Sequence, residues 1–225
     1  MIKIEKTEVF GWEAAIRGMR NPMNSWGRSD SFAWPGGIDL GPNDHELMMK
    51  LRNAGTDHRK FMRMITVYCD ITAPLYWWKE FDTYKVGTVA NSCSTMHKIA
   101  EKEFELDDFS HEHLGVFIPA EKNGGDECYQ NLWLETMKKT VDALNIARIH
   151  YLQEKDAKLK KDYWWQMIQL LPSSYNQKRT VMMNYEVLSN IYKSRKGHRL
   201  DEWNELCEWI ESLPYSEIIT GEKQD

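Results

Sequence analysis

The most regular hydrophobic pattern in the chain runs from Leu132 to Lys155, and it limits the possible folds more than any other segment. Its apolar side chains recur every three or four residues, which places them on one face of a helix. These side chains are Leu134, Met137, Val141, Leu144, Ala147 and Tyr151. The pattern therefore predicts one long amphipathic helix in the second half of the chain.

Three further helices are expected after this one. The first covers residues 162–171 and ends at Pro172, which cannot continue a helix. The second covers residues 180–196 and ends near Gly197. The third covers residues 200–212 and carries four side chains inward: Trp203, Leu206, Cys207 and Ile210. The second half of the chain is therefore expected to be helical.

The first half contains the expected strands. Residues 1–10 and the β-branched, aromatic run at 64–71 are both typical of strands. Between them, Asn43 or Asp44 is expected to cap a helix that ends at Gly55, with Glu46 completing a capping box. The other local predictions are a helix that starts at Pro74 and ends before Gly87, and a polar turn around Asn91.

No segment has the composition or length of an interdomain linker, so residues 1–225 are interpreted as a single domain. The predicted class is α+β, with a small mixed sheet in the N-terminal half and long helices in the C-terminal half.

The charge balance narrows the classes of partner. The chain carries 29 basic and 34 acidic side chains, a net charge of −5. This balance argues against binding of nucleic acid or an anionic membrane through overall positive charge. A few local cations suffice, however, to bind one free nucleotide. No apolar run has the length of a signal peptide or a membrane span. We expect a soluble, cytoplasmic protein that binds neither membranes nor nucleic acid.

The cysteines predict neither disulfides nor a metal site. All four (Cys69, Cys93, Cys128 and Cys207) are widely spaced, with no CxxC pair and no Cys/His cluster at zinc-ligand spacing. Cys93 is interpreted as an inert, buried thiol rather than a nucleophile. Ten tryptophans and ten tyrosines make the chain unusually aromatic. They form either an aromatic core or exposed surfaces for stacking and subunit contact.

The common nucleotide-binding and hydrolase motifs, such as GxxxxGK[ST], GxGxxG and GxSxG, are missing. A less standard pattern occupies residues 170–195. A Leu-Pro pair ending at Pro172 is followed by Asn184, Asn190 and Arg195. This segment resembles the C-terminal signature of the flavin-dependent thymidylate synthases, in which two asparagines and an arginine follow a Leu-Pro at fixed spacing.

A second stretch, residues 73–96, resembles the central motif of that family. The matching positions are Pro74, Asn91 and Ser94. The family's Arg-His-Arg falls on Thr83, Tyr84 and Lys85, or one residue later, because the comparison needs one insertion. Ser92 replaces the glutamate of the motif, and Met96 replaces its final arginine. The central motif is therefore eroded at its charged positions.

A weaker third likeness is His58, with Thr56 and Asp57, where the family places a histidine before a strand. The resemblance covers about residues 45–212, so it extends over most of the chain. It implies that this is a divergent member of the family, which methylates dUMP to dTMP. FAD would be the cofactor, methylenetetrahydrofolate and NADPH the co-substrates, and a homotetramer the assembly.

The resemblance also implies a set of site residues. Arg195 would be catalytic and would bind the uracil edge through two parallel hydrogen bonds. The implied cofactor-binding residues are Asn184, Asn190, Thr83, Tyr84, Lys85 and His58. The implied substrate-binding residues are Ser94, Ser92, Glu80, Lys79 and Arg195.

Each of these residues also has a simpler interpretation. Arg195 can complement a helix dipole, and the asparagines can be solvated helix residues, whose six-residue separation would point them to different sides. The serines can form a polar turn, and Trp77 and Trp78 can belong to the core or to an interface instead of stacking on a ligand. At the level of function, an enzyme, a catalytically impaired nucleotide- or flavin-binding protein on the same fold, and an unrelated helical protein remain open.

Overall fold

The computed structural model describes residues 2–34, 37–115 and 132–221. The chain divides into two compact units, each assembled from separate stretches. Unit 1 comprises the described residues of Thr72–Glu80 and Ser92–Lys178, and unit 2 those of Ile2–Ile71, Phe81–Asn91 and Arg179–Asp225. Because these stretches interleave, no single cut in the sequence separates the units. The single domain expected for residues 1–225 stays a prediction.

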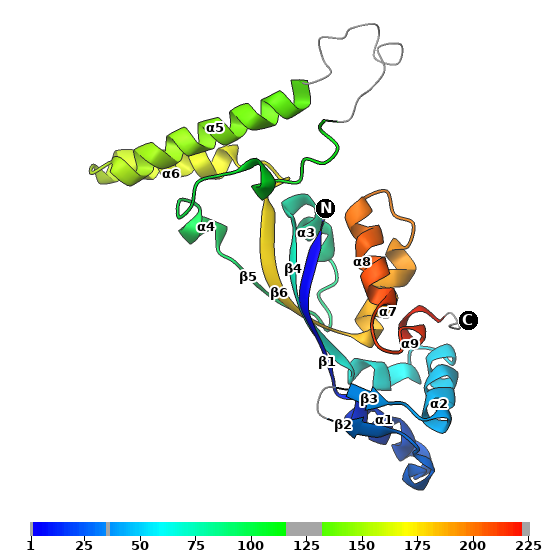
Figure 1. Cartoon of the computed structure of the whole chain (residues 1–225). Helices are drawn as coiled ribbons and strands as arrows, with labels where there is room; N and C mark the ends of the chain where they lie inside the picture. The colour runs from blue at the N-terminus through cyan, green and yellow to red at the C-terminus, as the bar shows by residue number, and fades with distance from the viewer. Residues whose placement is uncertain (1, 35–36, 116–131, 222–225) are drawn as a thin grey trace, which may run out of the picture. The chain divides into compact units, whose positions relative to one another are not determined.

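A four-stranded sheet is formed by strands from both halves of the chain (Figure 1). Its order is β1 (Lys3–Phe10), β4 (Thr66–Pro74), β6 (Asn176–Asn184) and β5 (Val89–Ser92). The structure confirms the α+β class and the two strands predicted near residues 1–10 and 64–71.

Two local predictions about this sheet are wrong. β6 occupies part of the predicted helix at 180–196, and β5 occupies the predicted turn around Asn91. Strands are therefore not confined to the N-terminal half. β6 lies between β4 and β5, and its pairing with these distant segments outweighs the weak local pattern of a largely polar sequence.

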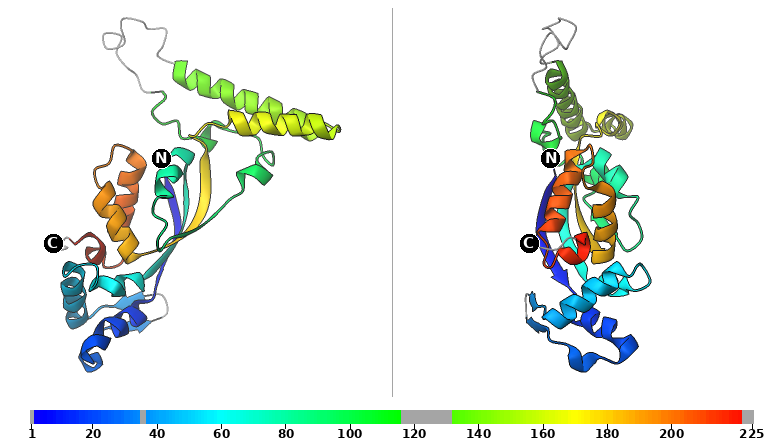
Figure 2. Two further views of the ribbon diagram at one scale, coloured as in Figure 1. Left: turned by 180° about the vertical axis from the view of Figure 1, so that it is seen from behind. Right: turned by 90° about the vertical axis from the view of Figure 1, so that its right-hand side faces the viewer.

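Unit 1 contains the predicted long helix. The helices of this unit are α3 (Leu75–Phe81, whose last residue belongs to unit 2), α4 (Thr95–Lys98), η4 (Leu106–Asp108), α5 (Leu132–Gln153) and α6 (Ala157–Leu170). α5 and α6 run side by side in every view (Figures 1 and 2). The predicted apolar face of α5 supplies Val141, Leu144 and Ala147 to a buried cluster that includes Met167 of α6. The amphipathic pattern is thus confirmed.

Trp77 and Trp78 on α3 belong to the core. They are 0% and 1% exposed, and the indole Nε1 of Trp78 donates to the carbonyl oxygen of Gln177 at 2.9 Å. Stacking of these two rings on a ligand is therefore wrong, and their core interpretation is confirmed.

Unit 2 contains the remaining elements. They are α1 (Trp12–Arg20), η1 (Asn21–Met23), η2 (Trp26–Arg28), the antiparallel pair β2 (Phe32–Trp34) and β3 (Gly37–Asp39), α2 (Pro42–Asn53), η3 (Arg59–Arg63), α7 (Tyr185–Arg195), α8 (Asp201–Glu211) and α9 (Glu217–Thr220). α8 confirms the helix predicted at 200–212, and its four predicted inward side chains are buried. Among the helices of the described ranges, none is long and apolar enough to cross a membrane.

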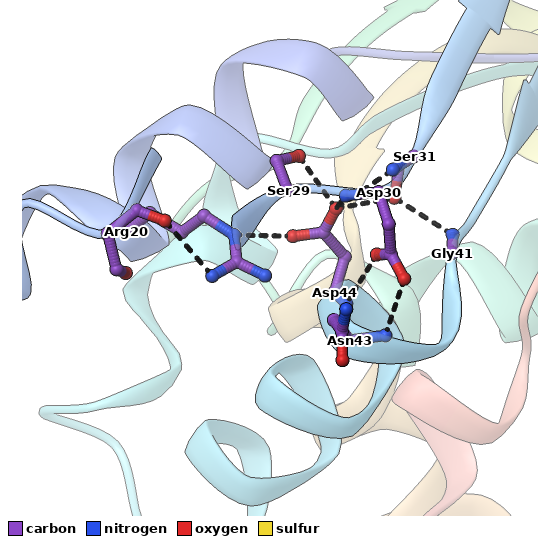
Figure 3. Close-up of polar contacts among 8 residues, drawn as sticks. Arg20, Ser29, Asp30, Ser31, Gly41, Asn43 and Asp44 are labelled. Atoms are coloured by element: carbon purple, nitrogen blue, oxygen red, sulfur yellow. Dashed lines mark hydrogen bonds and ion pairs between the residues drawn. The ribbon is translucent and has the colours of Figure 1, made fainter. Parts of the chain in front are cut away.

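The predicted capping of α2 by Asn43 or Asp44 is wrong. Both residues lie within the first turn of the helix, and their backbone N–H groups donate to the carboxylate of Asp30 at 2.9 and 3.1 Å (Figure 3). Asp30 caps the helix from outside, so the predicted capping box with Glu46 does not form. A cap supplied by a residue well before the helix leaves no signature at the helix start.

The three cysteines of the described ranges are unpaired thiols. Burial raises the pKa of Cys69 to about 12 and that of Cys207 to about 11. Cys93 is exposed, so the expectation of a buried thiol there is wrong. Cys128 lies outside the described residues.

Candidate functional site

The junction between β6 and α7 positions the first asparagine of the sequence pattern. Asn184 ends the strand, and its side-chain oxygen accepts a hydrogen bond from the backbone N–H of Val187 at 3.0 Å. Asn184 therefore caps α7 and is only 9% exposed. Asn190 lies on α7 itself, where its side-chain oxygen accepts from the guanidinium of Arg59 at 3.3 Å.

Both asparagines line one pocket of about 380 Å³, which we call the asparagine pocket. The expectation that they project to different sides is wrong, because Asn184 has an extended backbone instead of a helical one. The lining residues are Thr56, Arg63, Val86, Gly87, Asn184, Glu186, Val187 and Asn190.

Gly87 lies directly against the amide of Asn184. Its φ of +77° falls in the left-handed region, and a Cβ at this position would lie 2.9 Å from Asn184 Nδ2. Only glycine allows the backbone to pass so close to the asparagine. The glycine predicted to end a helix thus forms part of the pocket wall.

Glu186, the carboxylate in the lining of this pocket, is paired with two arginines. Arg59 Nε donates to Glu186 Oε1 at 3.1 Å, and Arg63 donates to the other carboxylate oxygen. Burial alone would raise the pKa of Glu186, but the hydrogen bonds from Arg63 and Arg59 outweigh it and hold the pKa below its usual range. Glu186 is therefore ionised near neutral pH, and these arginines exceed its charge.

Arg195 lies in the last turn of α7 and is held by aromatic side chains. Its Nε donates to the hydroxyl of Tyr84 at 2.9 Å, and its guanidinium carbon lies 4.4 Å from the ring centre of Trp203. Nη1 also contacts His198 Nε2 at 3.2 Å. Trp203 is fully buried, so it forms a rigid platform for the cation. The structure thus joins two predicted site residues, Arg195 and Tyr84.

Comparison with known proteins finds a likeness in fold but none in sequence. No protein-family model matches the chain, and no curated protein matches its sequence. Solved structures do match over nearly the full length. The flavin-dependent thymidylate synthase ThyX from Helicobacter pylori, complexed with FAD and dUMP, is 18% identical with a TM-score of 0.64, covering 96% of each chain. The UMP/dUMP methylase PolB from Streptomyces cacaoi, bound with 5-Br dUMP, is 13% identical with a TM-score of 0.63, covering 98% of this chain and 94% of that chain.

The chain has the fold of the flavin-dependent thymidylate synthases. At such low identity the likeness concerns the fold alone. The ligands of ThyX and PolB are properties of those proteins. What the thymidylate synthase fold does in this chain depends on its own side chains.

Two of the residues that replace the family's Arg-His-Arg are exposed in unit 2. Thr83 and Lys85 lie at the surface between α3 and β5, and neither lines the asparagine pocket. His58 is also exposed, at the start of η3, although its neighbour Thr56 does line the pocket. Contact of these three residues with a cofactor stays a prediction.

The remaining predicted residues of the thymidylate synthase motif belong to unit 1. Ser92 ends β5, and Ser94 caps α4 by accepting from the backbone N–H of His97 at 3.2 Å. Lys79 is exposed on α3, and Glu80 is the last residue of its stretch of unit 1. Their position relative to Arg195 stays a prediction.

The structure also places in pockets or contacts residues to which the sequence pattern assigned no role. Met96, which replaces the family's loop arginine, lines a pocket of about 500 Å³ in unit 1 together with His97, Lys160 and Lys161. In unit 2, Trp203 contacts Arg195 from α8, a segment without a recognisable motif. Glu186 lies within the segment of the C-terminal pattern but at none of its matching positions, and it lines the asparagine pocket. Only their three-dimensional neighbours identify them.

Proposed function

We propose that this protein is a divergent FAD-dependent enzyme that methylates the uracil ring of dUMP. The observation that carries the proposal is the convergence of Asn184 and Asn190 on one pocket, in the same unit as Arg195. These three residues form the pattern by which the sequence resembles the flavin-dependent thymidylate synthases, and the fold agrees with that resemblance.

The asparagine pocket has the chemistry that a flavin ring requires. Small-molecule pockets of about 300–1,000 Å³ typically combine apolar walls with a few placed polar groups. Here Val86 and Val187 supply apolar surface, and the two asparagine amides supply hydrogen-bonding groups. The close backbone at Gly87 keeps one wall free of a side chain. We therefore assign the flavin part of FAD to this pocket.

Arg195 is suited to bind the uracil edge. Tyr84 and Trp203 hold its guanidinium in place, so little conformational freedom remains to be lost when a ligand binds. A fixed guanidinium stabilises negative charge that develops on a uracil oxygen. When bound, reduced FAD supplies the hydride and methylenetetrahydrofolate supplies the carbon, with NADPH as the source of electrons.

A second candidate function is a catalytically impaired protein that binds a nucleotide or flavin on the same fold. The favouring observation is the mostly uncharged stretch at Thr83, Tyr84 and Lys85, where the family carries Arg-His-Arg. A lysine does not reproduce the bidentate phosphate binding of an arginine. Tritium release from labelled dUMP distinguishes the two candidates, because only the enzyme releases it.

FAD binding tests the assignment of the asparagine pocket. We expect Asn190→Ala and Asn184→Ser each to weaken FAD binding about two- to tenfold, because a neutral hydrogen bond contributes about 0.5–1.5 kcal/mol. Serine at 184 preserves the helix cap. The measurement is titration of flavin fluorescence, with Asn43→Ala as the control because Asn43 is exposed and lies outside the pocket. Unchanged affinity in both pocket variants would contradict the assignment.

We include the homotetramer of the family in this proposal. Unit 2 exposes aromatic side chains of the kind enriched at subunit interfaces. They include Phe10, Phe32, Trp34 and Tyr68, which are 52%, 68%, 43% and 40% exposed. Light scattering at micromolar concentration is expected to give about four times the chain mass of 26.6 kDa. A monomer would count against both the assembly and a site shared between subunits.

A further inference from the structure

A second pocket in unit 2 is lined by cations and polar groups. Its volume is about 510 Å³, and we call it the basic pocket. Its lining residues are Arg52, Asn53, Gly55, Arg59, Ser189, Asn190, Tyr192, Lys193, Lys196 and Thr220. Four of them are cationic and none is a carboxylate. The basic pocket shares only Asn190 with the asparagine pocket.

The charge of Arg52 is held in place by neutral partners. Its Nε and Nη2 donate to the backbone carbonyls of Ile218 and Ile219 at 3.2 and 3.1 Å, and Nη1 donates to the amide oxygen of Asn53. Burial, together with the nearby positive charge of Arg59, lowers the pKa of Arg52. The guanidinium is therefore fixed in position, and within residues 2–34, 37–115 and 132–221 its hydrogen bonds go to neutral oxygens.

The described carboxylates around the pocket are fewer than its cations. Glu186 binds both Arg59 and Arg63, and Glu211 lies 3.7 Å from Lys196. Asp57 acts on Arg63 through its charge. Among the described residues, the lining cations and their contacts thus comprise five cations (Arg52, Arg59, Arg63, Lys193 and Lys196) and three carboxylates (Asp57, Glu186 and Glu211), a surplus of two positive charges. This surplus contrasts with the net charge of −5 of the whole chain.

We propose that the basic pocket binds an oligophosphate group, the di- or triphosphate of a nucleotide. Arg52 and Arg59 provide fixed positive charge, and the exposed ammonium group of Lys193 is free to adjust to a phosphate oxygen. Ser189 and Thr220 add hydroxyl groups to the lining. Phosphate recognition in proteins combines such cations with hydroxyl and amide donors. The residues assigned to the flavin ring and the uracil edge lie outside the basic pocket, apart from Asn190, so the pocket adds a separate site. Where its ligand is the diphosphate of FAD, the proposal rests on the proposed function.

Two sources could supply the group: the diphosphate of FAD extending from the asparagine pocket, or a separate nucleoside triphosphate. Both share the same phosphate chemistry. The variant Lys193→Glu tests whether the pocket binds phosphate. Lys193 is exposed, so reversing its charge leaves the packing of the core intact. Lys50→Glu is the matched control, since Lys50 is also exposed in the last turn of a helix of unit 2 but does not line the pocket.

The experiment is calorimetric titration of the full chain with inorganic tripolyphosphate at low and at physiological salt. We expect binding that weakens with salt, and Lys193→Glu to weaken it at least about tenfold while Lys50→Glu changes it less than about twofold. Circular dichroism checks that both variants fold. An absence of tripolyphosphate binding, or an equal loss in both variants, overturns the proposal.

A parallel titration with FAD distinguishes the two sources. If Lys193→Glu also weakens FAD binding, the pocket takes the diphosphate of FAD. If FAD binding is unchanged and tripolyphosphate still binds in the presence of saturating FAD, the ligand is a separate nucleotide. Because tripolyphosphate lacks a flavin and a base, failure of this proposal is distinguishable from failure of the flavin assignment.

Discussion

Replacing Arg195 by alanine is expected to weaken dUMP binding at least about tenfold while the protein stays folded. A charge-assisted hydrogen bond contributes about 1.5–3 kcal/mol, and one such bond already corresponds to about tenfold or more in affinity. The fold should survive because Arg195 is only half-buried, and its contacts with Tyr84 and Trp203 lie beside the core. Calorimetric titration of wild type and variant with dUMP is the measurement.

Two further variants separate this role from simpler ones. Arg195→Lys keeps the positive charge but loses the paired donors, so we expect an intermediate affinity. Arg199→Ala removes a nearby exposed guanidinium and should leave dUMP binding unchanged. If Arg195 only complements the dipole of α7, its loss costs about 0.3–1 kcal/mol of stability and dUMP affinity does not change. That result would remove Arg195 from the proposed site.

The predictability of each element follows from the range of the interactions that stabilise it. α5 and α8 could be predicted because their apolar side chains repeat along the helix itself. β6 could not, because a largely polar segment becomes a strand only when β4 and β5 lie on either side of it. The same reason explains β5, whose four residues are all exposed and carry no apolar alternation.

The candidate site shows the same division. Asn184, Asn190 and Arg195 could be identified from their spacing in one segment. Their geometry could not, because it depends on where β6 ends and where α7 begins. Gly87 and Trp203 come from other segments, and no local pattern links either of them to the asparagines or to Arg195. The basic pocket could not be predicted from the sequence either, since its cations come from α2, η3 and the end of α7.

Asp44 makes the most concentrated set of buried polar contacts around α2. One carboxylate oxygen accepts from Arg20 Nε at 2.6 Å (Figure 3). The other accepts from the Ser29 hydroxyl, the Ser31 hydroxyl and the backbone N–H groups of Asp30 and Ser31, at 2.7–3.1 Å. Asp44 is 0% exposed and Arg20 4%, so the pair is isolated from water. The loop before α2 therefore depends on this single carboxylate.

We expect Asp44→Asn to lower the free energy of unfolding by about 3–5 kcal/mol, because the buried Arg20 charge loses its carboxylate counter-ion and, among the described residues, keeps only the Ser25 carbonyl as a partner. The amide also places donors where the serine hydroxyls and backbone N–H groups already donate. Urea denaturation followed by tryptophan fluorescence is the measurement. The double variant Arg20→Met/Asp44→Asn should lose less than the sum of the two single variants, since no unpaired charge remains. A loss below about 1 kcal/mol in Asp44→Asn would contradict the role of the ion pair.

The pH dependence of this loss identifies the charged form as its cause. Burial alone would raise the pKa of Asp44, but the hydrogen bonds from Ser31, Ser29 and Arg20 outweigh it and hold the pKa below the usual value. A carboxyl group with a lowered folded-state pKa stabilises the protein above its unfolded pKa of about 3.9, and this contribution is lost as the pH falls through the folded-state pKa. The difference in unfolding free energy between wild type and Asp44→Asn should therefore be constant above about pH 5 and shrink as the pH falls below about 4. Other carboxylates with lowered pKa values, such as Glu186, are present in both proteins and cancel in the difference. A difference that does not change with pH would mean that Asp44 acts through its shape and hydrogen bonds, and not through its charge.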